Sequence, residues 1–316
     1  MKPLPRLVSQ FAERMLQFVT FKRMQGYDYK DGLDRIKRFA AFLAHPACTG
    51  GVLRAAQVDG YRAAIRPLPI SAQAKHLSTV RQFSFYLHAL EPESVVLPAR
   101  LLPRHSRRIR FYPLSPAQVS TLMAATSIFK PEQGIRAHCL RFLIGLLYST
   151  GLRIAEALAL NLGDVDAKQG TLFVRRGKFR KERLVPMSPS TIEALKQWLA
   201  LRSTYAYGDG YAPLLVVGWN KRLNREQVAH AFARLCVHCG LGGDPTPRIH
   251  DLRHNYACRC LARWREAQED VDALLPVLTN AMGHVNFRST QLYIHIDAVG
   301  LQQASAKFHT RVYPAQ

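Results

Sequence analysis

The chain has 316 residues, of which 48% are hydrophobic, enough to fill the cores of about two ordinary domains and too many for an intrinsically disordered protein. Lysine and arginine number 44 against 22 aspartate and glutamate, giving a formal net charge of +22. Phosphate groups neutralise such charge and release counterions, so the balance favours a nucleic acid as partner, with a generally basic protein as the alternative.

The sequence predicts neither a membrane span nor a secretory signal. The longest apolar run, residues 142–148, is far too short to cross a bilayer. Near the N-terminus, Arg6, Glu13 and Arg14 interrupt the stretch that a signal peptide needs to be apolar. We therefore expect no membrane partner and a cytoplasmic location, where cysteines stay reduced.

The first third of the chain predicts a small all-helical domain, which we assign to residues 1–98. Apolar residues recur at helical spacing in segments 7–21, 31–44 and 72–89. No alternating strand pattern occurs before residue 100. Lys75 and Arg81 fall on the polar side of the third helical segment, where we expect them to contact DNA.

Residues 99–111 predict an extended basic linker. No acidic residue occurs between Glu93 and Glu132, and prolines flank the arginines. The arginines expected to follow a phosphate backbone are Arg104, Arg107, Arg108 and Arg110. A solvated basic loop is the alternative.

The remaining residues, 112–316, predict a mostly helical domain. Ser115 is expected to begin a helix, with Gln118 completing a capping box. A β-hairpin is expected over 171–186, with its turn at Gly177. Further helices are expected at 137–149, from about 152, and at 189–201, 224–238, 251–265, 270–282 and 298–308. The predicted fold class is therefore mainly α with a small antiparallel β-sheet (α+β).

The cysteines raise the question of a zinc site. Cys236 and Cys239 form a C-x-x-C pair at the end of one predicted helix, and Cys258 and Cys260 lie within another. Two cysteines separated by one residue on a helix point to different faces, which does not suit a common metal. We expect free, buried or half-buried thiols and no metal site.

A basic protein that acts on phosphodiesters without a metal needs a nucleophile, cations for the developing charge and an acid for the leaving oxygen. No paired-carboxylate cluster stands out, so arginine, lysine and histidine are the candidates. Arg153 and Glu156 are three residues apart at a helix start, which places them on one face. His250 and Arg253 have the same spacing at a second helix start.

Three segments resemble the signature of the tyrosine recombinase (phage integrase) family, in the same order along the chain. TGLRIAE at 150–156 is similar to its T-G-x-R-x-x-E motif, and HDLRH at 250–254 to its H-x-L-R-H motif. MGH at 282–284, followed by TQLYIH at 290–295, resembles L-G-H and T-x-x-Y-x-H. This combination is far more specific than one short motif. The resemblance covers about residues 112–308 and implies a catalytic domain behind a helical core-binding domain.

The resemblance implies a role for each matching residue. Arg153 and Arg253 would bind the non-bridging oxygens of the scissile phosphate. Tyr293 would attack phosphorus, displace a 5′-hydroxyl and remain as a 3′-phosphotyrosine. His250 would assist proton transfer from Tyr293, and His284 would hydrogen-bond the phosphoryl group.

Two lysines are candidates for the general acid. The resemblance implies Lys178 in the hairpin turn, but the family often has glycine after this lysine and this chain has Phe179, so Lys181 is the alternative. Glu156 would orient the arginine side of the site, and His254 would have a supporting or structural role. The other basic residues of the hairpin are expected to contact phosphates, with a solvated face as the alternative: Arg175, Arg176, Arg180, Lys181 and Arg183.

The resemblance also implies a reaction without cofactor, metal or ATP, double-stranded DNA as substrate and a homotetramer on two duplexes, with other recombinases as possible partners. The helix at 298–308 would dock on a neighbouring protomer or on its own domain. The long, acidic stretch between His254 and Met282 is similar to transposon-associated members. Two alternatives remain: a type IB topoisomerase-like activity, and a catalytically silent DNA-binding accessory protein.

Overall fold

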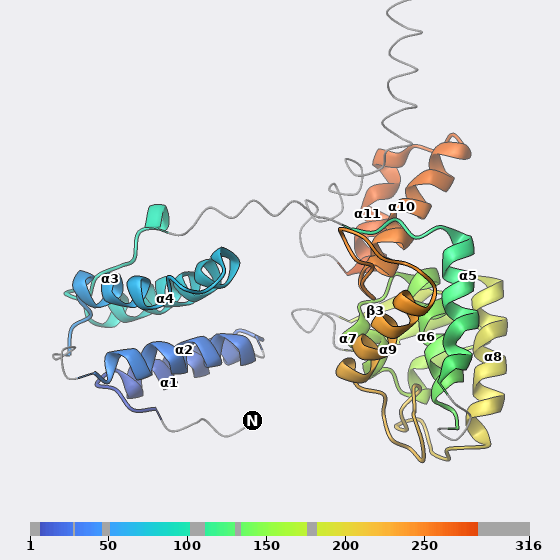
Figure 1. The fold of residues 1–316 in the computed structure, drawn as a ribbon, viewed down its shortest axis with the longest axis horizontal. Coiled ribbons are helices and arrows are strands. Elements are labelled where there is room, and N and C mark those ends of the chain that lie inside the picture. The colour runs from blue at the N-terminus through green and yellow to red at the C-terminus, as the bar shows by residue number, and fades with distance from the viewer. Residues whose placement is uncertain are drawn as a thin grey trace, which may run out of the picture. The chain divides into compact units, whose positions relative to one another are not determined.

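The computed structural model describes residues 7–27, 29–45, 51–101, 111–129, 134–175 and 182–283. The chain divides into two compact units, Met1–Arg108 and Ile109–Gln316, and each is described by itself (Figure 1). Helices dominate both units, and the described residues contain one three-stranded antiparallel sheet, so the predicted fold class is confirmed. In the described ranges, no helix is long and apolar enough to span a membrane.

The N-terminal unit consists of four helices around an aromatic core. They are α1 (Ala12–Met24), α2 (Lys30–Leu43), α3 (Ala55–Ala64) and α4 (Ile70–Leu90), as Figure 1 shows. The fully buried rings of Phe18 and Phe83 meet edge-on with centroids 5.6 Å apart, which joins α1 to α4. Lys75 is exposed on α4, and the guanidinium of Arg81 lies 4.6 Å from the ring centroid of Phe85.

Helix α3 was not predicted, and its composition explains why. It buries only Gln57, Val58 and Tyr61, and contains Gly60, so it lacks the apolar repeat of a strongly amphipathic helix. The predicted linker begins with a 3-10 turn at Ala99–Leu101 rather than with extended chain. The linker arginines 104, 107, 108 and 110 lie outside the described residues.

The C-terminal unit is built around α6, which is buried on most sides by α5, α8 and α10. Its helices are α5 (Pro116–Ala124), α6 (Arg136–Thr150), α7 (Ile154–Ala159), α8 (Pro189–Ser203), α9 (Arg225–His238), α10 (Asp251–Glu266) and α11 (Val271–Met282). The predicted capping box is confirmed, because Ser115 Oγ accepts from the Gln118 amide at 3.2 Å and Gln118 Oε1 accepts from the Ser115 amide at 2.9 Å.

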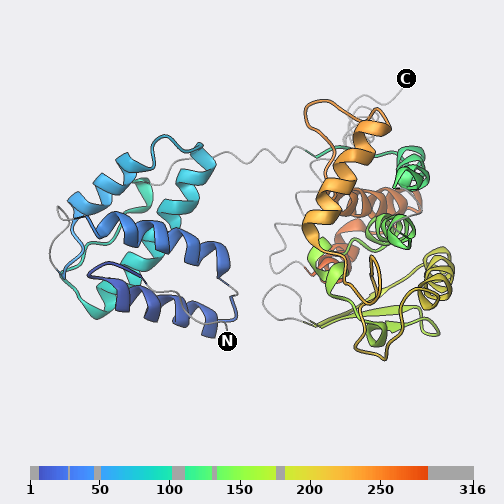
Figure 2. The same ribbon diagram turned by 60° about the horizontal axis from the view of Figure 1, so that its bottom comes forward.

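The sheet lies beside the helices of this unit (Figure 2) and consists of β1 (Val165–Asp166), β2 (Thr171–Val174) and β3 (Arg183–Pro186). The predicted hairpin is confirmed: β2 pairs antiparallel with β3, with Val174 opposite Arg183. β1 adds to the other edge of β2 and, with two residues, is too short to show an alternating pattern. The hairpin connection, 176–181, lies outside the described residues.

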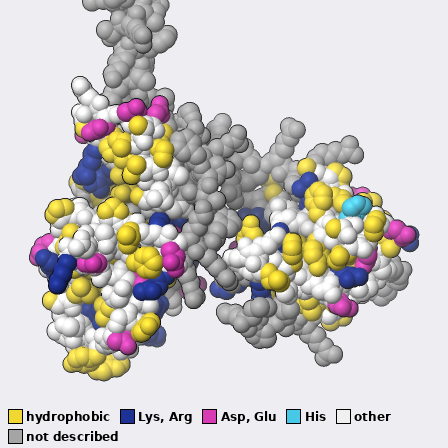
Figure 3. Space-filling model, turned by 180° about the vertical axis from the view of Figure 1, so that it is seen from behind, with side chains coloured by type: hydrophobic (Ala, Val, Ile, Leu, Met, Phe, Trp, Pro, Cys, Tyr) yellow, Lys and Arg dark blue, Asp and Glu magenta, His cyan; other side chains and the backbone are white. Residues whose placement is uncertain are grey.

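The surface of both units mixes basic, acidic and hydrophobic side chains on the face drawn in Figure 3. Inside the C-terminal unit, Cys236 is buried, and Cys239, Cys258 and Cys260 are partly buried free thiols, as expected. Burial raises the pKa of the Cys236 thiol to about 11, so it stays protonated at neutral pH.

Candidate active site

The first predicted motif forms the junction between α6 and α7. α6 ends at Thr150 and is followed by Gly151, whose φ of +64° is left-handed, and a Cβ on Gly151 would lie 2.2 Å from a ring carbon of Tyr256. Arg153 is the residue that precedes α7, so it stands at the helix terminus rather than on the predicted helix face. The spacing still brings the pair together, because Glu156 accepts from the Arg153 amide at 3.0 Å and from its guanidinium at 2.7 Å.

The second motif begins α10. His250 is the residue before the helix, and Arg253 lies in its first turn with only 2% of its surface exposed. The Arg253 guanidinium donates to the carbonyl of Gly151 at 2.7 Å and to that of Met282 at 2.6 Å. It therefore connects the end of α6 to the end of α11.

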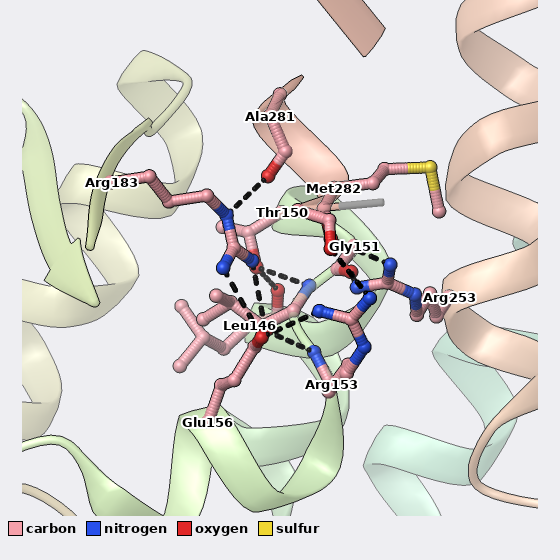
Figure 4. Close-up of polar contacts among 11 residues, drawn as sticks. Leu146, Thr150, Gly151, Arg153, Glu156, Arg183, Arg253, Ala281 and Met282 are labelled. Carbon is pink, nitrogen blue, oxygen red and sulfur yellow. Dashed lines mark hydrogen bonds and ion pairs between the residues drawn. The ribbon is translucent and has the colours of Figure 1, made fainter. Parts of the chain in front are cut away.

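Three guanidiniums converge on the last turn of α11, as Figure 4 shows. Arg183 Nε donates to the carbonyl of Ala281 at 2.9 Å, Arg253 to Met282, and Arg153 Nη2 to Gly283 at 2.7 Å. The last carbonyls of a helix lack partners within it and carry the negative end of its dipole. The carbonyls at the end of α11 therefore bind cations, and they accept hydrogen bonds from one arginine each of β3, α10 and the α6–α7 junction.

The carboxylate of Glu156 is the counter-charge within this group. It accepts from Arg153 and, through both oxygens, from Arg183 at 2.8 and 3.1 Å. Burial by itself raises the pKa of Glu156, but the hydrogen bonds and charge of Arg183 and the bonds from Arg153 outweigh it and lower the pKa to about 2.

The group therefore has a net positive charge at neutral pH, because the three guanidiniums outnumber the one carboxylate and the partial negative charge at the end of α11. Bonds to the described residues do not use every N–H of Arg153, whose side chain is 23% exposed. A site of this kind attracts an anion, and arginine suits a phosphate because its planar fork can bond two oxygens at once.

His250 and His254 form a second, uncharged part of the site. Their rings are nearly perpendicular, with centroids 4.8 Å apart, and His254 also lies against Phe111. His250 keeps part of its surface open to solvent, but desolvation by the surrounding protein lowers its pKa to about 4, and repulsion from Arg253 and from the protonated form of His254 adds to this effect. Burial likewise lowers the pKa of His254. His250 is therefore neutral at physiological pH and available to accept a proton.

The other predicted site residues are only partly placed. Those outside the described residues are Arg176, Lys178, Arg180, Lys181, His284 and Tyr293, and their assignments stay predictions. Arg175 is half-exposed and forms an ion pair with the buried Asp164. Among the residues that the structure does describe, no three histidine, cysteine or carboxylate side chains gather as metal ligands.

Arg183 differs most from its sequence-based assignment as a DNA contact. Its side chain is only 8% exposed, and its guanidinium bonds Glu156 and Ala281. A signal for this was present, because alternate residues of a strand share a face and Arg183 therefore points to the same side as Val185, which is 1% exposed.

Comparison with known proteins gives consistent matches over most of the chain. The model of the phage integrase family matches residues 113–299. The protein named integrase/recombinase y4rB of Sinorhizobium fredii is 32% identical over 302 residues, which cover 91% of this chain and 93% of that protein. The tyrosine recombinase XerC of Chlamydia trachomatis is 30% identical over 76% of this chain and 70% of its own length.

Solved structures share the fold at lower identity. The XerH site-specific recombinase, in a post-cleavage complex with a palindromic difH substrate, has a TM-score of 0.66 at 17% identity and covers 97% of this chain and 99% of its own. The Tn1549 transposon integrase in complex with transposon right end DNA has a TM-score of 0.63 at 16% identity, covering 93% of this chain and 99% of its own.

Proposed function

The chain belongs to the phage integrase family of tyrosine recombinases, and from that premise we propose that it cuts and rejoins DNA strands through a covalent bond between Tyr293 and a 3′-phosphate. The observation that carries this proposal is the convergence of Arg153 and Arg253 on one turn of α11. Residues that lie far apart in the sequence meet there as a cationic group with a single carboxylate.

In the proposed reaction the two arginines bind the non-bridging oxygens of the scissile phosphate and stabilise the charge of the transition state. The Tyr293 oxygen forms a bond to phosphorus while the bond from phosphorus to the bridging 5′-oxygen breaks. The neutral imidazole of His250 accepts the tyrosine proton. His284 hydrogen-bonds the phosphoryl group.

The departing 5′-oxygen takes a proton from Lys178, with Lys181 as the alternative donor. Attack of a 5′-hydroxyl on the phosphotyrosine then reverses these steps and joins a new strand. Because the phosphodiester energy is kept in the tyrosine linkage, the reaction needs neither ATP nor a metal. The charge of +22 supports double-stranded DNA as the substrate, with the linker arginines and the basic hairpin as the expected phosphate contacts.

We further propose that the protein acts in the cytoplasm as a homotetramer on two DNA duplexes and mobilises a transposon-like or integrated element. The similarity of this chain's fold to that of the Tn1549 transposon integrase supports a role in mobilising such an element. A tetramer follows from the exchange of strands between two duplexes, since each duplex has two strands to cut and each protomer supplies one nucleophile.

A nicked duplex tests the proposal. The duplex carries the end sequence of the element that encodes the chain, with a nick close to the cleavage site, so that the short 5′-hydroxyl fragment diffuses away and the covalent intermediate accumulates. Wild type, Tyr293→Phe and Tyr211→Phe are compared on a denaturing gel. Tyr211 is a suitable control because its side chain is 85% exposed and lies outside the three motifs.

We expect an adduct from wild type and Tyr211→Phe and none from Tyr293→Phe. An adduct that persists in Tyr293→Phe would assign the nucleophile to another tyrosine. Intact DNA binding without an adduct in any variant would favour the accessory protein. Efficient relaxation of supercoiled DNA without paired sites would favour the topoisomerase-like activity.

A further inference from the structure

Arg183 contributes a third guanidinium to the site without being one of the residues proposed to bind the phosphate. It enters from β3, which pairs with β2 and packs against α11. Its partners are the two oxygens of Glu156 and the carbonyl of Ala281, and its side chain is 8% exposed. These bonds use Nε and both terminal nitrogens of Arg183, and they direct its guanidinium toward Glu156 and α11.

The geometry of these bonds requires an arginine. One edge of the guanidinium spans both carboxylate oxygens of Glu156, while Nε donates to Ala281. A lysine ammonium has the same charge but cannot bond a carboxylate through a planar fork and reach a second acceptor in a fixed direction.

Arg183 is also in close contact with the turn that ends α11. Gly283 has a φ of +64°, and a Cβ on it would lie 2.7 Å from Arg183 Nη1 and 3.2 Å from Arg153 Nη1. The two guanidiniums therefore pack directly over this glycine. Arg153 is oriented from two sides, by Glu156 and by the Gly283 carbonyl. Arg183 bonds Glu156 and packs over Gly283, the residue that carries this carbonyl.

We propose that Arg183 is a positioning residue for strand cleavage: it fixes Glu156 and the last turn of α11 in one arrangement, and so sets the direction in which Arg153 presents its guanidinium. This inference rests on the proposed function, because it assigns Arg153 to the scissile phosphate. It separates Arg183 from the other basic residues of the hairpin, which are expected to contact the DNA backbone directly.

The test measures single-turnover cleavage of the nicked duplex and, separately, DNA affinity as a function of salt. The full chain is used as wild type, Arg183→Lys and Arg183→Gln. We expect cleavage to fall about 100-fold in both variants, since a misplacement of about 1 Å at a reacting centre has an effect of this size. DNA affinity and its salt dependence should remain those of wild type.

A phosphate contact would give the opposite pattern and would overturn the proposal. Arg183→Gln would then weaken binding and lower the slope of log affinity against log salt by about 1, while Arg183→Lys would largely retain binding and cleavage. Arg202→Lys is the control for a loss of cleavage that comes only from lower stability of the C-terminal unit. Arg202 is 3% exposed and donates to the carbonyls of Pro213 and Ala206 instead of to the site. This control should lose stability but keep wild-type cleavage under conditions where it is folded.

A double-mutant cycle tests whether Arg183 acts through Glu156. We expect cleavage by Arg183→Gln/Glu156→Gln to be no slower than by the slower single variant, because both substitutions interrupt one chain of contacts. Multiplied losses would overturn the inference. The double variant lacks both buried charges, so neither is left without its partner, and it is the protein to test if one of the single variants does not fold. In that case, wild-type cleavage by the double variant would overturn the inference, and cleavage as slow as in the single variant that does fold would support it.

A wild-type protein that binds DNA but forms no adduct would contradict the proposed function, and the positioning role of Arg183 would lose its basis as well. An adduct in wild type with unchanged cleavage in folded Arg183→Lys and Arg183→Gln would reject the positioning role alone.

Discussion

Replacing Glu156 by glutamine removes the only carboxylate that the structure shows bonded to Arg153 and Arg183. The carboxylate accepts two hydrogen bonds from Arg183, one from the Arg153 guanidinium and one from the Arg153 amide. A glutamine side chain offers one acceptor oxygen and places an NH₂ group, itself a donor, against these donors. We therefore expect the C-terminal unit to lose stability.

The magnitude follows from the pKa of the group. The pKa of Glu156 is lowered from its ordinary 4.5 to about 2 in the folded protein. At about 1.4 kcal/mol per pKa unit, the ionised carboxylate stabilises the folded state by about 3 kcal/mol at neutral pH. Because the unfolded chain binds the proton more readily, this stability is present above pH 4.5 and is lost as the pH falls from 4.5 toward 2.

Tryptophan fluorescence during urea unfolding measures this effect in the right unit, because all three tryptophans, 198, 219 and 264, lie in Ile109–Gln316. Glu156→Gln should lower the free energy of unfolding by about 3 kcal/mol at pH 7 and flatten its dependence on pH below 4.5. Glu193→Gln, an exposed substitution on α8, should change it by about 0.5 kcal/mol or less. A loss below about 1 kcal/mol, with unchanged pH dependence, would refute the assigned ion pairing.

Three further substitutions have specific expected outcomes. In urea unfolding, Gly151→Ala should destabilise the C-terminal unit by at least about 2 kcal/mol more than Gly240→Ala. Both glycines have a similar positive φ, but an added Cβ would meet the ring of Tyr256 at Gly151 and no atom within 4 Å at Gly240. Equal losses of stability would contradict the steric explanation. His250 should stay neutral down to about pH 4, so its contribution to stability is present above pH 6.5 and lost as the pH falls to 4. His250→Asn should flatten the stability profile in that range, and an unaltered profile would contradict the assignment. Replacing Arg107 and Arg108 together by glutamine should reduce the slope of log DNA affinity against log salt by about 2, whereas an unchanged slope would remove these two from the DNA contacts.

The elements that could be predicted from sequence were those with a strong local signal. The helix at 251–265 and the hairpin at 171–186 have clear periodicity, and the structure places them at Asp251–Glu266 and in β2 and β3. α3 was missed because its stability comes from tertiary packing of a few residues against the other helices, which no local pattern reveals.

The sequence could predict which residues form the site better than how they are arranged. Spacing paired Arg153 with Glu156, the resemblance to the family implied that Arg253 acts with Arg153, and the structure brings all three together. The common anchor at the end of α11 could not be predicted, because it depends on backbone carbonyls whose direction is set by tertiary structure. The burial of Arg183 was missed because a basic side chain in a basic hairpin was interpreted by its charge and not by the strand alternation that aligns it with Val185.

Mapping the covalent bond between protein and DNA tests directly whether Tyr293 is the nucleophile. The wild-type adduct on the nicked duplex is digested with nuclease and then with trypsin, and the modified peptide is identified by mass spectrometry. Cleavage after Arg288 and Lys307 gives peptide 289–307, in which Tyr293 is the only tyrosine. We expect this peptide to carry the mass of the remaining nucleotide through a phosphate on Tyr293. A nucleotide on any other peptide, or none on a protein that binds the duplex, would contradict it.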